Sequence, residues 1–154
     1  MSDDAWQLLH NLVATPSPSG HEEEAAGVLR DWLAKRGLSP TTDAAGNVRA
    51  SAGSGPIHVL LAGHIDCAEP FVPARIDGDV LWGRGAVDAK GPLAAFAAAT
   101  LAAAGRDDVR VTLVACTGEE ADSRGAHHLI DSGFSCDALV VGEPSGAHAV
   151  TIGY

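Results

Sequence analysis

The sequence predicts an α/β fold in which helices flank a largely parallel central sheet. Apolar runs typical of buried strands alternate with helical patterns along the chain. Three of these apolar runs lead directly into loops that carry histidine or acidic residues. The chain has 154 residues, of which 46% are hydrophobic, which is enough for one globular domain with a core. We therefore expect a single α/β unit.

The charge balance is strongly acidic. Asp and Glu number 20 against 10 Lys and Arg, and the formal net charge of −10 repels nucleic-acid phosphates and anionic membrane surfaces. Cys67, Cys116 and Cys136 are odd in number and lack C-x-x-C spacing, which argues against a disulfide framework or a thiolate zinc site. The sequence shows neither a signal-peptide pattern nor a long apolar run. We expect a cytoplasmic protein that binds neither nucleic acid nor membranes.

Two helices are expected before the first strand. Apolar residues at helical spacing over residues 8–13 predict a short helix that Ser2, Asp3 and Asp4 cap and that Pro16 ends.

The second helix is expected over residues 21–36. Ser19 is expected to cap it and Gly37 to end it. An apolar stripe along this helix places Trp32 in the core.

The run from Ile57 to Ala62 predicts a buried strand that leads into His64-x-Asp66. His64 can give one ring nitrogen to a cation while the acidic side chain of Asp66 accepts the other N–H. A loop histidine beside a solvated aspartate is the alternative for this stretch alone. Short strands are expected to flank residues 46–47, with residues 48–51 pairing with the strand that leads to His64.

A hairpin over residues 74–82 is expected around the turn Asp77-Gly78-Asp79. It leads to Asp88, just ahead of an Ala-rich helix that has Pro92 in its first turn and runs to Ala104. An Asp in this place is more commonly a helix cap than a ligand.

Two further strands are expected over residues 109–115 and 138–141, with a helix over residues 124–132 between them. Ligands bind beyond the carboxyl ends of parallel strands, and the strand-end residues are therefore expected to meet at one edge of the sheet. The residues delivered to that edge are His64, Glu119 with Glu120, and Glu143.

Histidine and carboxylates without thiolates favour zinc, cobalt or manganese in a hydrolytic site. A bridging carboxylate would hold two metals about 3.5 to 4 Å apart, and the pair lowers the pKa of bound water. A further carboxylate that is not a ligand would act as general base. Glu119 and Glu120 could divide these roles, although two adjacent glutamates are often only solvated charge.

Four motifs together resemble the co-catalytic zinc aminoacylase and carboxypeptidase family, which includes acetylornithine deacetylase and succinyl-diaminopimelate desuccinylase. The motifs are Gly63-His64-Ile65-Asp66, Gly83-Arg84-Gly85-Ala86-Val87-Asp88-Ala89-Lys90-Gly91-Pro92, Thr117-Gly118-Glu119-Glu120 and Gly142-Glu143-Pro144-Ser145. Within the family, they look most like the acetyl-lysine deacetylases, also described as hydrolases that release lysine or ornithine from an amino-group carrier protein.

The resemblance implies two zinc ions, with cobalt or manganese as alternatives. His64 and Glu143 would bind the first metal and Glu120 the second, and Asp88 would bridge both. Asp66 would orient His64 and Glu119 would be the general base, so these two are the implied catalytic residues. A cis peptide after Asp88 is also implied.

The implied substrates are N-acyl amino acids or lysine and ornithine linked to a carrier protein, in lysine and arginine biosynthesis. Family members continue into a lid or dimerisation domain, form homodimers and supply a final histidine ligand, whereas this chain stops at Tyr154. We expect residues 1–154 to be the N-terminal portion of the catalytic domain. His127, His128 and His148 match no ligand motif.

Two other functions remain open from sequence. One is a metal-binding but catalytically inactive module, kept folded by a partner or by self-association over an open sheet edge. The other is a structural fragment whose acidic residues are only solvated.

Overall fold

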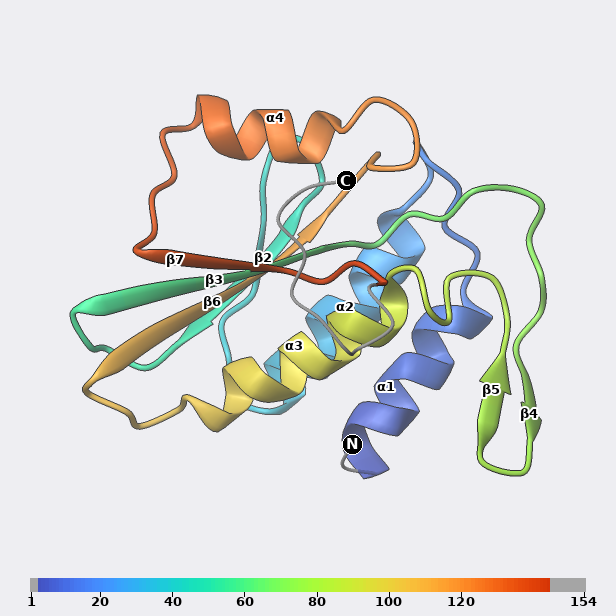
Figure 1. Cartoon of the computed structure of the whole chain (residues 1–154), viewed down its shortest axis with the longest axis horizontal. Helices are drawn as coiled ribbons and strands as arrows, with labels where there is room; N and C mark the ends of the chain where they lie inside the picture. Colours follow the sequence, from blue (N-terminus) through green and yellow to red (C-terminus); the bar gives the residue numbers. More distant parts are fainter. Residues whose placement is uncertain (1–2, 145–154) are drawn as a thin grey trace.

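The computed structural model describes residues 3–144, and within them a five-stranded mixed sheet lies between two layers of helices (Figure 1). The strand order is β1-β2-β6-β3-β7. The strands of this sheet are β1 (Thr41–Thr42), β2 (Val48–Ala52), β3 (Ile57–His64), β6 (Val109–Cys116) and β7 (Ala138–Val141). The helices are α1 (Asp3–Ala14), α2 (Glu23–Lys35), α3 (Lys90–Ala102) and α4 (Arg124–Asp131). The α/β architecture expected from the sequence is confirmed.

Strand β3 lies between β6 and β7 and runs parallel to both. Helix α3 crosses from β3 to β6 and helix α4 crosses from β6 to β7, as connections between parallel strands of one sheet require. The pairing expected for residues 48–51 is wrong, because β2 pairs antiparallel with β6, with Val48 opposite Ala115. Both edges of β3 are already occupied, so β2 extends the sheet at the outer edge of β6.

The two faces of the sheet form separate apolar clusters because side chains alternate along each strand. From β6, Leu113 and Ala115 pack with α1, α2 and α3 in the larger cluster. Val114 and Cys116 face the other way and pack with Leu129 of α4. The prediction that Trp32 lies in the core is confirmed, because Trp32 is buried in the larger cluster.

Helix α2 begins at Glu23 and has no side-chain cap, so the cap expected from Ser19 is wrong. The hydroxyl of Ser19 instead donates to Oδ2 of Asp66, 2.6 Å away. Beyond the helix end, Gly37 adopts a φ of 86°, a left-handed conformation that favours glycine. The cap expected from Ser2 lies outside the described residues.

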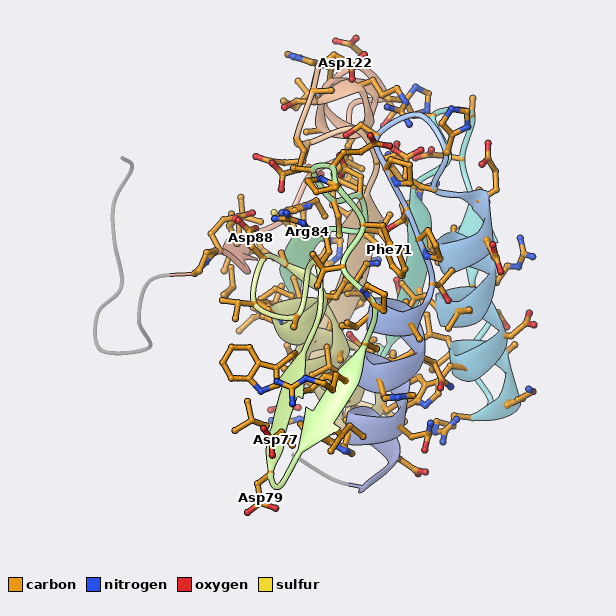
Figure 2. The ribbon with its side chains drawn as sticks, turned by 90° about the vertical axis from the view of Figure 1, so that its right-hand side faces the viewer. Phe71, Asp77, Asp79, Arg84, Asp88 and Asp122 are labelled. Atoms are coloured by element: carbon orange, nitrogen blue, oxygen red, sulfur yellow. The ribbon has the colours of Figure 1, made fainter. Side chains whose placement is uncertain are left out.

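A two-stranded hairpin stands apart from the main sheet, and it consists of β4 (Arg75–Asp77) and β5 (Val80–Trp82). Figure 2 shows Asp77 and Asp79 near the tip of this hairpin, well separated from Asp88. The three cysteines are free thiols, as expected. Among residues 3–144, no helix has the length and apolar character needed to cross a membrane.

Candidate metal centre

The carboxyl ends of the parallel strands bring predicted site residues together. His64 is the last residue of β3 and lies beside Cys116, the last residue of β6. The loop that carries Glu119 follows Cys116, and Glu143 follows β7, where the N–H of Gly142 donates to the carbonyl of Ala62 at 2.8 Å. The hydrogen-bonded register of three strands therefore sets the relative positions of these side chains.

The ring of His64 is buried, with 1% of its side chain exposed, and its two nitrogens face different groups. Nδ1 lies 3.0 Å from the backbone oxygen of Asp66. A carbonyl oxygen only accepts hydrogen bonds, so Nδ1 carries the hydrogen and Nε2 is left to face the cluster of carboxylates. The expected acceptor was the carboxylate of Asp66, which lies farther away, at 3.5 Å.

Three carboxylates surround Nε2 of His64. Oδ1 of Asp88 lies at 2.8 Å, and the nearest oxygens of Glu119 and Glu143 each lie at 3.9 Å. One ligand atom each from His64, Asp88 and Glu143 lie within 4.8 Å of one another. Four ligands around tetrahedral zinc are roughly 3.3 Å apart, because zinc lies about 2.0 Å from each. The donor atoms and their spacing thus fit a divalent cation.

The other acidic groups of this cluster disfavour the ionisation of Glu143. Burial raises the pKa of Glu143, and the charges of Asp88, Glu119 and Glu120 raise it further, although His64 opposes them. A cation at the cluster would relieve this repulsion. The repulsion around Glu143 and the spacing of the ligand atoms therefore both favour a cation at this cluster.

Asp66 is fully buried and forms hydrogen bonds with several groups besides the ring of His64. Its carboxylate accepts the N–H of Glu119 and the N–H of Glu120, both at 3.0 Å, as well as the hydroxyl of Ser19. Burial raises the pKa of Asp66, but the nearby His64 ring and the hydrogen bonds from Ser19 and the two backbone N–H groups outweigh it and lower this pKa to about 2. Asp66 therefore remains ionised and links β3 to the loop after β6.

Glu120 is not part of the three-residue group, although its N–H contacts Asp66. The peptide between Asp88 and Ala89 is cis, as the resemblance implied. His127 is exposed, and His128 lies 4.0 Å from Asp43 rather than at the cluster. His148 and Ser145 lie outside the described residues.

Comparison with known proteins assigns the chain to a family. Residues 60–154 match the model of peptidase family M20/M25/M40. The chain belongs to this family. LysW-lysine hydrolase of Deinococcus radiodurans is 42% identical over 154 residues, which cover 97% of the chain and 42% of that protein. LysW-lysine/LysW-ornithine hydrolase of Sulfurisphaera tokodaii is 35% identical over 148 residues, which cover 96% and 41%.

A solved structure of the M20 family has the same fold. A dinuclear metal-binding peptidase from Bacillus subtilis superposes with a TM-score of 0.70 at 16% identity, covering 89% of this chain and 41% of that one. The chain spans less than half the length of each of these relatives.

Several side chains of this M20 domain that support the site were missed by the sequence analysis. They are Ser19, Glu22, Asn47 and Arg124. Glu22 stands in a run with Glu23 and Glu24, which are exposed, so residue type does not distinguish the buried member. A helix pattern that left Glu22 at the apolar face, beside Ala25 and Ala26, was the one available signal.

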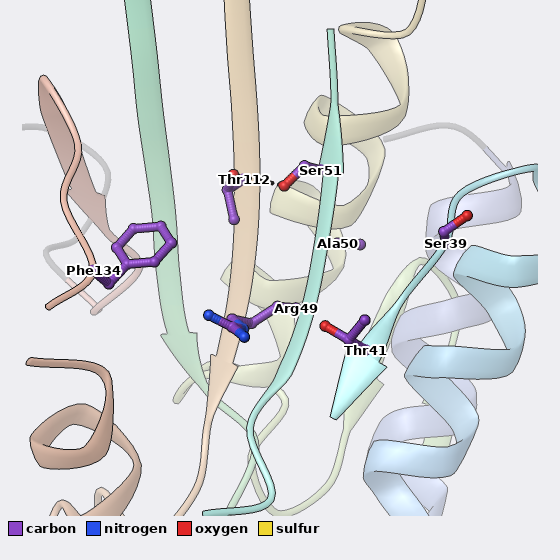
Figure 3. Close-up of a pocket in the computed structure, with 7 residues that line it drawn as sticks. All are labelled: Ser39, Thr41, Arg49, Ala50, Ser51, Thr112 and Phe134. Atoms are coloured by element: carbon purple, nitrogen blue, oxygen red, sulfur yellow. Dashed lines mark hydrogen bonds between the residues drawn. The ribbon is translucent and has the colours of Figure 1, made fainter. Parts of the chain in front are cut away.

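A cavity of about 350 Å³ includes none of the predicted site residues. It is lined by Ser39, Thr41, Arg49, Ala50, Ser51, Thr112 and Phe134 (Figure 3). Its hydroxyl groups include those of Ser51 and Thr112, which hydrogen-bond to each other at 2.8 Å. The candidate catalytic chemistry of the domain therefore belongs to the strand ends and not to this cavity.

We predict that the metal-free protein loses stability as the pH rises from 6.5 to about 9. Burial lowers the pKa of His64, but the carboxylates of Asp66 and Asp88, which lie 3.5 Å and 2.8 Å from its ring nitrogens, and the charge of Glu143 outweigh it and raise this pKa from 6.5 to about 9. A raised folded-state pKa contributes stability that is complete below pH 6.5 and is lost as the pH passes about 9. Thermal unfolding in chelator across this range measures the effect.

His64→Gln is the matched variant for this prediction, because it removes the titrating group and keeps a polar side chain. Its unfolding temperature should change less with pH than that of the wild type. With zinc present the wild-type trend should reverse, since the metal competes with the Nε2 proton. A metal-free wild type whose stability is constant or increases from pH 6.5 to 9 would contradict the assignment.

Proposed function

We propose that this chain carries the metal site of an amidohydrolase that releases lysine or ornithine from an amino-group carrier protein. The observation that carries the proposal is His64, whose Nε2 faces the carboxylates of Asp88, Glu119 and Glu143 at the strand ends. Membership of the M20 family supports a hydrolase. The names of the relatives support LysW-linked lysine and ornithine as the substrate class.

In this proposal His64, Asp88 and Glu143 hold the first metal ion. Glu120, together with Asp88, would hold the second, with zinc as the metal and cobalt or manganese as alternatives. Bound divalent ions would supply a lowered pKa for water and polarisation of the amide carbonyl. The backbone oxygen of Asp66 accepts the hydrogen on Nδ1 and so directs Nε2 of His64 toward the metal site.

Glu119 is proposed as the general base. Its carboxylate is 42% exposed and approaches His64 Nε2 to 3.9 Å, so it lies beside the metal site and remains accessible to water. As the water oxygen bonds to the amide carbon, Glu119 takes one proton from that water. The carbon–nitrogen bond then breaks, and Glu119 passes the proton to the leaving amine.

We propose that the substrate joins a macromolecule, the carrier protein, to a small amino acid through the amide bond that is cleaved. Simple N-acyl amino acids are the smaller members of the same class. A cytoplasmic location, a role in amino-acid biosynthesis and a homodimer of the longer form belong to this proposal as well.

Hydrolysis assays on the zinc-loaded chain test this function. The substrates are lysine linked to its carrier protein, N-acetyl-lysine and N-acetyl-ornithine. We expect release of lysine from the carrier conjugate, its loss on treatment with chelator and its return when zinc is added back. Zinc binding without hydrolysis of any of the three would contradict the proposed activity.

Zinc binding without hydrolysis would favour a metal-binding module that has no activity of its own. The position of β7 supports this alternative. Strand β7 lies at the edge of the sheet within the described residues, and its side chains are exposed. Leu139 is 54% exposed and Val141 is 55% exposed. An edge of this kind pairs readily with another strand. Sedimentation of the purified chain would detect such association.

A further inference from the structure

The loop from Thr117 to Glu120 is held in an uncommon way. Its four consecutive backbone N–H groups all donate to side chains, and each of these hydrogen bonds is 3.0 Å long. Oδ1 of Asn47 accepts from Thr117, and Oε1 of Glu22 accepts from Gly118. The two oxygens of Asp66 accept from Glu119 and Glu120.

Glu22 differs from the other two acceptors in two ways. It lies far in sequence from the strand ends, and its carboxylate is paired with a cation. Its side chain is 4% exposed, and one nitrogen of Arg124 contacts both of its carboxylate oxygens at 2.6 Å. Oε1 also accepts the N–H of Gly20. A buried carboxylate with this many donors is fixed in place.

Gly118 lies against this ion pair. Its φ is 71°, and a Cβ at this position would lie 2.3 Å from Nη1 of Arg124. The pair thus sets the path of the backbone immediately before Glu119. Since the next two N–H groups bind Asp66, a shift at Gly118 would be passed to Glu119 and Glu120 together.

We propose that Glu22, paired with Arg124, is a positioning residue that fixes the Glu119–Glu120 loop for metal binding and proton transfer. This inference rests on the proposed function. It assigns Glu22 no contact with substrate or metal. It adds to the site a partly buried ion pair contributed by the segment before α2 and the first turn of α4.

Two measurements on the full chain test the inference. The first is zinc affinity, by competition with a chromophoric chelator. Glu22→Gln and Arg124→Met should each weaken zinc binding by about 10- to 100-fold, as loss of groups that orient metal ligands does. Arg124→Lys should remain within about threefold of wild type, because a single nitrogen makes both contacts with Glu22. Glu24→Gln, on the exposed side of α2, is the matched control.

The second measurement is amide hydrogen exchange of the metal-free chain. Glu22→Gln should speed exchange at Gly118, Glu119 and Glu120 by at least about tenfold and leave Leu113 in β6 nearly unchanged. A residue that only stabilises the fold would lower the unfolding temperature without selective exchange in this loop. The double variant Glu22→Gln with Arg124→Met leaves no unpaired buried charge and replaces Arg124→Met where that variant does not fold.

The outcomes separate the two proposals. Wild-type affinity in Glu22→Gln and Arg124→Met would overturn the positioning role and leave the metal site intact. Absence of zinc binding in the wild type would overturn the proposed function. In that case, loop exchange selectively faster in Glu22→Gln supports the positioning role of the ion pair on the loop, and unchanged exchange overturns it.

Discussion

Glu119→Gln is expected to reduce hydrolysis by the zinc-loaded chain about 10²- to 10⁴-fold, the range typical of a lost general base. Glutamine is isosteric with glutamate but cannot take a proton from water at neutral pH. Since His64, Asp88 and Glu143 form the group of potential ligands without Glu119, zinc affinity should change by less than about threefold. Steady-state rates and a zinc competition titration on the same preparations measure both quantities.

Glu24→Gln is the control for this substitution, because Glu24 is exposed and belongs to α2. It should match the wild type in rate and in zinc affinity. Loss of zinc from Glu119→Gln would contradict the general-base assignment and make Glu119 a ligand. An unchanged rate would contradict any role in proton transfer.

Asp66→Asn is expected to destabilise the metal-free protein by about 2 to 4 kcal/mol, because hydrogen bonds to a charged group contribute about 1.5 to 3 kcal/mol each. Asn presents one acceptor oxygen where Asp66 presents two, so one of the N–H groups of Glu119 and Glu120 would face an NH₂ group. For a chain of this size the unfolding temperature should fall by roughly 5 to 15 °C. Calorimetry in chelator measures this change.

The matched control is Asp131→Asn, at an exposed position in the last turn of α4, which should leave the unfolding temperature nearly unchanged. The lowered pKa of Asp66 adds a pH signature. Its contribution is complete above the ordinary value of 3.8 and is lost as the pH falls towards 2. Asp66→Asn with wild-type stability at neutral pH would show that these hydrogen bonds do not hold the loop.

Local patterns were sufficient to predict most elements of the fold. The apolar run before His64 predicted β3, the Ala-rich run after Asp88 predicted α3, and the turn at Asp77-Gly78-Asp79 predicted the β4–β5 hairpin. These signals lie within a single segment, so they are visible without tertiary contacts. The partner of β2 was not predictable in this way, because β3 and β6 offer similar apolar strands and only the two crossovers decide which edge is free.

The candidate site divides in the same manner. His64 ends β3 and Glu143 follows β7, so the rule for parallel sheets was enough to place them together. The groups that hold the loop were missed because they act across large sequence separations. Glu22 reaches Gly118 across 96 residues and Asn47 reaches Thr117 across 70. Ser19 was assigned to the nearest helix because its true partner, Asp66, is 47 residues away.

The central claim is that His64, Asp88 and Glu143 form a metal site, and zinc stoichiometry tests it most directly. The measurement uses purified chain that is stripped with chelator, re-loaded with zinc and analysed for metal per chain, alongside His64→Ala and the exposed control His21→Ala. We expect at least one tightly bound zinc in the wild type and in His21→Ala, and its loss in His64→Ala. No bound zinc in the wild type, or equal zinc in His64→Ala, would contradict the claim.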